Sequence, residues 1–87
     1  MNSTVIEYYT KRFGEDLPTA FIHLIRETGE IALAIEKNNS VHAKLKITEA
    51  VALLQYIASQ YDLNLDENIQ SLYAHKFDKL AEKQRGS

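Results

Sequence analysis

The fold is decided by the stretch FIHLIRETGEIALAI, which runs from Phe21 to Ile35. At about 100° per residue, its apolar side chains fall on one face of a helix, wide enough to pack against a core. Glu27 and Glu30 lie together at the border of that face, with His23 one turn earlier. Carboxylates at such a border are costly without a cation or a proton. We therefore expect a packed helix that carries half of a metal site. Its buried face should comprise Phe21, Leu24, Ile25, Thr28, Ile31, Ala32 and Ile35.

The composition describes one small globular domain. The chain has 87 residues, a formal charge of −2 and no cysteine. This charge offers no basic footprint for nucleic acid, and the lack of cysteine excludes disulfides and thiolate sites. We expect residues 1–84 to form a single domain and interpret residues 85–87 as the remains of a tag. A core of this size is marginal, so self-association would help it.

The start of the chain lacks the basic region and the apolar core of a signal peptide. No apolar run is long enough to span a bilayer. We therefore expect a cytoplasmic protein without a membrane partner.

The chain before the turn at Asn38 and Asn39 predicts two helices. Ser3 can cap a short first helix that runs to about Phe13, and Gly14 can close it. Pro18 belongs in the first turn of a second helix, which should end near Lys37.

The second half of the chain predicts two more helices, and no strand pattern appears anywhere. Ser40 can cap a third helix over about residues 41–61. Asn64 can cap a fourth helix, with Glu67 reaching back to it. The short connection makes the second and third helices an antiparallel hairpin. The apolar stripe of the third helix should comprise Ile47, Ala50, Val51, Leu54, Ile57, Ala58 and Tyr61. That of the fourth should comprise Ile69, Leu72, Tyr73, Phe77 and Leu80.

A third carboxylate should meet the first two. Glu30 lies nine residues before Asn39 and Glu49 lies ten after it, so the hairpin should make these glutamates near neighbours. Three negative charges in one small space repel one another and call for a cation. Oxygen ligands without cysteine favour Mg²⁺ or Mn²⁺. Lys46, one turn before Glu49, is a second source of positive charge.

These residues resemble a known family. Phe21-Ile22-His23-Leu24-Ile25-Arg26-Glu27-Thr28-Gly29-Glu30-Ile31-Ala32, Asn38-Asn39, Ile47-Thr48-Glu49-Ala50-Val51 and Leu63-Asn64-Leu65-Asp66-Glu67 are similar to the MazG-like all-α nucleoside triphosphate pyrophosphohydrolases, which are related to phosphoribosyl-ATP pyrophosphohydrolase. The family pattern is E-x-x-E on one helix and E-x-x-D on the next. Here Glu49 stands for the final Asp, and Lys46 stands where the family has an acid.

The resemblance implies a four-helix, all-α fold that assembles as a dimer or tetramer, and a reaction. Mg²⁺, or Mn²⁺, would be held by Glu27, Glu30 and Glu49. Cleavage would occur between the α and β phosphates of a nucleotide, with Glu27 or Glu30 orienting or deprotonating the attacking water. Lys46, His23 and Lys76 would contact the substrate.

Lys46 leaves several outcomes open. Its ammonium can replace the charge of one metal and touch a phosphate, pair with a glutamate and leave an inactive site, or extend into water. The expected function is therefore a nucleotide pyrophosphohydrolase whose activity Lys46 alters or abolishes. The alternative is a catalytically inactive oligomerisation or partner-binding module of the same fold.

Overall fold

The computed structural model describes residues 2–85, and all regular structure within them is helical. The four helices are α1 (Ser3–Phe13), α2 (Leu17–Glu36), α3 (Ser40–Ser59) and α4 (Leu65–Arg85). The expected all-α chain of four helices is thereby confirmed. Of the three residues interpreted as a tag remnant, Arg85 ends α4, and Gly86 and Ser87 lie outside the described residues.

The first helix begins one residue earlier than its expected cap. The Asn2 side chain accepts hydrogen bonds from the backbone N–H groups of Thr4 and Val5, at 3.0 and 3.2 Å. Ser3 is already helical, so its expected role as the cap is wrong. Asn is as good a cap as Ser, and the structure uses the one whose oxygen reaches both amides. Gly14 ends the helix at φ 59°, a conformation that glycine adopts without strain.

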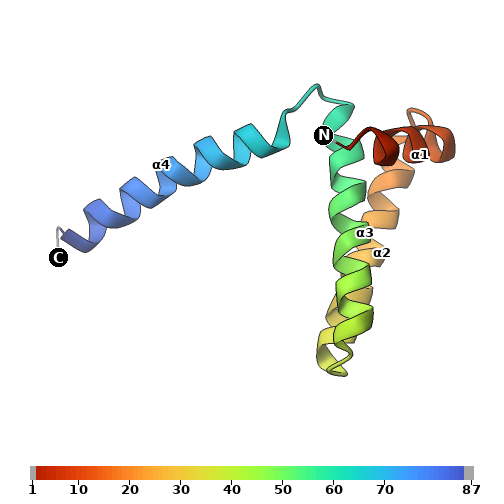
Figure 1. Cartoon of the computed structure of the whole chain (residues 1–87), viewed down its shortest axis with the longest axis horizontal. Helices are drawn as coiled ribbons and strands as arrows, with labels where there is room; N and C mark the ends of the chain where they lie inside the picture. Colours follow the sequence, from red (N-terminus) through yellow and green to blue (C-terminus); the bar gives the residue numbers. More distant parts are fainter. Residues whose placement is uncertain (1, 86–87) are drawn as a thin grey trace.

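The turn between α2 and α3 uses both asparagines. Asn38 takes the left-handed conformation at φ 55°. Asn39, at φ −91°, caps α3 by accepting a 3.1 Å hydrogen bond from the backbone N–H of His42. Ser40 was the expected cap and is instead the first helical residue. The three residues from 37 to 39 therefore suffice to connect two long helices that lie side by side (Figure 1).

The core lies where α1 packs against α2 and α3. Its buried residues are Ala20, Leu24, Ala50, Leu53 and Tyr56, and Tyr9 and Phe13 of α1 pack against them. Tyr56 is completely buried and donates a hydrogen bond from its hydroxyl to the Gly14 carbonyl. One side chain thus joins the end of α1 to α3.

The expected buried faces of α2 and α3 are partly wrong. Leu24, Ala50 and Ala58 are buried, whereas many of their expected neighbours are exposed. Both helices are apolar over more than one face, and a chain with a single short α1 covers only one of them. The exposed members are Phe21, Ile25, Thr28, Ala32 and Ile35 of α2 and Ile47, Val51, Leu54 and Tyr61 of α3.

The last helix extends away from the other three (Figure 1). None of its residues is buried, and its expected apolar stripe is exposed throughout. The radius of gyration is 16.4 Å, against about 12 Å for a compact domain of this length. No helix within residues 2–85 has the length and apolarity needed to cross a membrane.

Candidate functional site

Four charged side chains meet between α2 and α3. Glu27 and Glu30 come from α2, and Lys46 and Glu49 come from α3. The Lys46 Nζ atom lies 2.7 Å from Glu30 Oε2, 3.4 Å from Glu27 Oε2 and 3.7 Å from Glu49 Oε2. The structure therefore brings together the three carboxylates that the sequence placed near one another, and it puts an ammonium group among them.

Helical spacing explains the convergence. Glu27 and Glu30 are three residues apart on α2, and Lys46 and Glu49 are three apart on α3, so each pair shares one side of its helix. The side chains of Lys46 and Glu27 are only 16% and 18% exposed, which leaves them between the helices. Glu30 and Glu49 are more open, at 48% and 38%. The cluster thus runs from the packed interior to the surface.

Lys46 and Glu30 form its strongest pair. The hydrogen bond from Lys46 lowers the pKa of Glu30. The same bond, together with the charges of Glu27 and Glu49, raises the pKa of Lys46 well above its ordinary 10.5 although burial acts in the opposite direction. Lys46 is therefore charged at neutral pH.

Glu27 is the least satisfied member of the cluster. Its Oε2 atom is buried and has no hydrogen-bond partner. Its contact with Lys46 at 3.4 Å is an ion pair without the directed geometry of a hydrogen bond. Because a buried carboxylate oxygen without a donor is costly, the nearby ammonium is important to this residue.

A small cavity of about 50 Å³ adjoins the cluster. It is large enough for a water molecule or two. Tyr9 lines it, and burial together with the negative charge of Glu49 raises the pKa of this tyrosine. His23 also lines it, with its ring centroid 5.1 Å from that of Phe13. The full lining is Tyr9, Arg12, Phe13, His23, Glu27, Glu49 and Leu53.

Tyr9 and Arg12 are site neighbours that the sequence analysis did not single out. Both lie on α1, whose crossing over α3 is a tertiary feature. Their spacing of three residues is the only local sign that they share a side of the helix.

The predicted substrate residues are not all brought together. Lys46 and His23 lie at or beside the cluster. Lys76 lies on α4, which extends away from the other helices, and its ammonium is 5.6 Å from the ring centroid of Tyr73 on the same helix (Figure 1). Within one chain, therefore, Lys76 is not part of the cluster.

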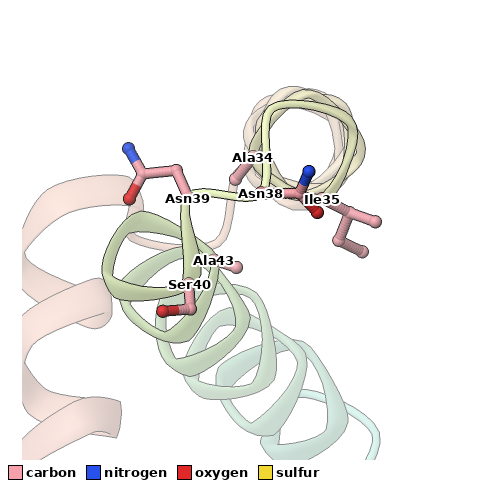
Figure 2. A pocket seen from close by; sticks show the side chains of 6 residues that line it. All are labelled: Ala34, Ile35, Asn38, Asn39, Ser40 and Ala43. Atoms are coloured by element: carbon pink, nitrogen blue, oxygen red, sulfur yellow. The ribbon is translucent and has the colours of Figure 1, made fainter.

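A larger hollow of about 280 Å³ lies at the turn between α2 and α3 (Figure 2). It offers no charged side chain for catalysis or metal binding. Its lining is Ala34, Ile35, Asn38, Asn39, Ser40 and Ala43.

Comparison of the chain with models of known families, with curated proteins and with solved structures finds no match.

The carboxylates do not fit a magnesium ion as they stand. The resemblance to the MazG-like hydrolases implies Mg²⁺ held by Glu27, Glu30 and Glu49. The Lys46 ammonium, however, is within ion-pair distance of all three. A dication placed among the same oxygens would be repelled by that charge. Among residues 2–85, no group of three or more His, Asp or Glu side chains is arranged to hold a metal ion.

Proposed function

We propose that this chain is a non-catalytic, self-associating helical module, in which Lys46 takes the place of the metal ion used by the hydrolases that the sequence resembles. One observation carries the proposal: the Lys46 ammonium contacts Glu27, Glu30 and Glu49 at 2.7 to 3.7 Å. In this proposal α2 and α3 act as an antiparallel hairpin, and the ion cluster fixes their register.

The chemistry of the cluster supports this proposal over hydrolysis. Hydrolysis of a triphosphate by this type of site needs a dication to neutralise the phosphates and to lower the pKa of water. Lys46 provides one positive charge, and three carboxylates already surround it. The resulting net charge is negative and would repel a triphosphate that arrives without metal.

The exposed side of the α2–α3 pair supports self-association. His23 and Tyr56 both contact Phe13 of α1. Ala32 and Ile47 each lie nine residues from one of them, which is half a turn around the helix axis at about 100° per residue. The apolar residues of α2 around Ala32 therefore point away from α1, whereas Ile47 and Val51 of α3 border a hollow that Asn2 and Val5 at the start of α1 also line. We call this surface the bare face: Phe21, Ile25, Ala32 and Ile35 of α2, with Ile47, Val51 and Leu54 of α3.

The amount of exposed surface agrees with a missing partner. The chain exposes 6812 Å², whereas a folded monomer of 9.9 kDa exposes about 5,200 Å². The excess is roughly 1,600 Å² per chain, and a standard interface takes about 800 Å² from each partner.

The decisive experiment exchanges the internal cation for a carboxylate. In wild-type protein, Mg²⁺ or Mn²⁺ should leave the melting temperature unchanged, and a panel of nucleoside triphosphates should release no pyrophosphate. Lys46→Glu should acquire a melting temperature that rises with Mg²⁺ concentration, because metal binding to the folded state stabilises it. Adding Glu30→Gln to that variant should remove the response.

Lys44→Glu is the matched control, because it makes the same charge change at an exposed position of α3. It should gain no response to metal. Pyrophosphate release by the wild-type protein that depends on Mg²⁺ and disappears in Glu30→Gln would overturn the proposal in favour of the hydrolase.

A further inference from the structure

The isolated helix α4 has the surface of an interface helix. Its apolar side chains occupy one side, within about 140° of arc, and the opposite side carries Glu67, Asp78 and Glu82. Exposure of the apolar set ranges from 49% at Ile69 to 71% at Phe77. In proteins most of the stability of an amphipathic helix comes from packing of its apolar face. The set, which we call the α4 stripe, is Ile69, Leu72, Tyr73, Phe77 and Leu80.

The corner before α4 joins two helix ends that are each closed by hydrogen bonds. At the end of α3, the N–H of Leu63 donates to the carbonyl of Ala58 at 3.1 Å, and that of Asp62 donates to Ser59 at 3.2 Å. With Asp62 at φ 52°, these two bonds make a Schellman motif. The Asn64 side chain then caps α4 by accepting from the N–H of Glu67 at 3.2 Å.

The stop signal of one helix is thus followed at once by the start signal of the next. The connection is therefore short and hydrogen-bonded, which disfavours folding of α4 back onto its own α2 and α3. Figure 1 shows α1 on one side of the α2–α3 pair and α4 extending from the other. The α2 part of the bare face points away from α1, so a chain packed on it would lie beside the outward helix.

The two uncovered surfaces also match in length. On α2 the bare face runs from Phe21 to Ile35, which is about 21 Å at 1.5 Å per residue. From Ile69 to Leu80 the α4 stripe covers about 17 Å by the same measure. One chain therefore carries both an apolar helix without a partner and an apolar surface long enough to receive it.

We propose that α4 is an exchanged arm, whose stripe packs against the bare face of a second copy of this chain. This inference rests on the proposed self-association and specifies its geometry. Exchange in both directions buries the α4 stripe and part of the bare face of each chain, which a pairing of α4 with α4 alone would not do. It is also consistent with the excess of roughly 1,600 Å² of exposed surface per chain, which is twice the share of one partner in a standard interface.

Cysteine cross-linking tests the exchange directly, because the chain has no cysteine of its own. Three variants place one cysteine along the α4 stripe: Ile69→Cys, Tyr73→Cys and Phe77→Cys. Each is mixed as a full-length chain with Ile25→Cys, given time to exchange subunits, and treated with a short bismaleimide. Tags of different length on the two chains identify mixed dimers on a denaturing gel. Three positions cover the possible registers.

We expect mixed cross-links for at least one position, at about tenfold or more over the control Asp78→Cys, which lies on the opposite side of α4. A further variant carries Ile25→Cys and one stripe cysteine in the same chain. Cross-linking only within that chain would show folding back and overturn the exchange. Dominant cross-links between two Phe77→Cys chains would show pairing of α4 with α4 and overturn it as well.

Sedimentation equilibrium of the unlabelled wild-type chain separates this inference from the function beneath it. A dimer without cross-links from α4 to α2 refutes the exchanged arm and leaves self-association standing. A chain that remains monomeric up to about 100 μM, which is a hundredfold above a micromolar dissociation constant, refutes both proposals.

Discussion

The two sides of helix α3 have similar apolar content and opposite surroundings. On one side Leu53 and Tyr56 are buried against α1 and α2, at 2% and 0% exposure. On the other, Ile47 and Val51 are 46% and 48% exposed. The comparison teaches that an apolar pattern identifies surfaces that need a partner, and does not say whether the partner is in the same chain. The following predictions test that difference, beginning with the largest expected effect.

The covered side should dominate the stability of the single chain. Leu53→Ala removes a fully packed side chain and should lower the free energy of unfolding by about 2–5 kcal/mol. Urea denaturation followed by circular dichroism measures this. In dilute protein, Val51→Ala should change the same quantity by less than about 1 kcal/mol, because its side chain is half exposed there. Equal losses in both variants at the lowest usable concentration would contradict the contrast between the two sides.

The bare face should contribute most of the free energy of dimer formation. Leu54→Glu places a charge on the bare face and should weaken the dimer by about 100-fold or more, because the charge would be desolvated at an apolar interface. Sedimentation equilibrium measures the dissociation constant. Lys37→Glu, at an exposed position in the turn, is a control that should leave it nearly unchanged. A Leu54→Glu protein that still sediments as a dimer would place the interface elsewhere.

The ion cluster adds a pH dependence to stability. Its bond to Lys46 depresses the pKa of Glu30 below its ordinary 4.5, so this stabilisation is complete above pH 4.5 and is lost as pH falls through the depressed value. The raised pKa of Lys46 gives stabilisation that is complete below pH 10.5 and is lost as pH rises beyond it. Stability should therefore be greatest between these limits.

Melting temperatures across this range check the prediction. Glu30→Gln should reduce the acid-side slope, whereas Glu36→Gln, at an exposed position near the end of the same helix, should not. An unchanged acid limb in Glu30→Gln would show that the cluster contributes nothing to folding.

Local rules predicted the helices well. Gly14, Pro18 and Asn64 each act through their own backbone or through amides three residues away, and all three do what the sequence indicated. Two caps were misplaced by one residue, at Asn2 and Asn39, because adjacent Asn and Ser are nearly equivalent as caps.

Tertiary choices could not be predicted in the same way. The count from Asn39 was enough to bring Glu49 near Glu30, since the separation depends only on helix geometry. Whether the Lys46 ammonium extends into water, contacts one glutamate or contacts three depends on how deeply its long side chain is packed. That side chain is 16% exposed, and no spacing rule predicts this burial. The buried face of α2 was equally out of reach, because two of its faces are apolar.

A smaller effect on stability is expected where Tyr56 joins α3 to the end of α1. Tyr56→Phe keeps the buried ring and removes the hydrogen bond from its hydroxyl to the Gly14 carbonyl. The loss should be about 1 kcal/mol, since that carbonyl is left without its donor. Urea denaturation measures it, and Tyr61→Phe, on an exposed ring, is the control. No difference between the two would show that packing alone joins α1 to α3.

The smallest expected effect is informative through its sign. Gly29 lies in the middle of α2, where glycine costs about 1 kcal/mol relative to alanine. An added Cβ would meet nothing within 4 Å in the single chain. If the chain acts alone, Gly29→Ala should therefore raise its stability by up to about 1 kcal/mol. If a second copy packs closely against the exposed side of α2, the same methyl group would clash with it and weaken the dimer. Unfolding measured at two protein concentrations a hundredfold apart distinguishes these cases: stabilisation at the low concentration with destabilisation at the high one requires a helix from another chain beside Gly29, and stabilisation at both excludes it.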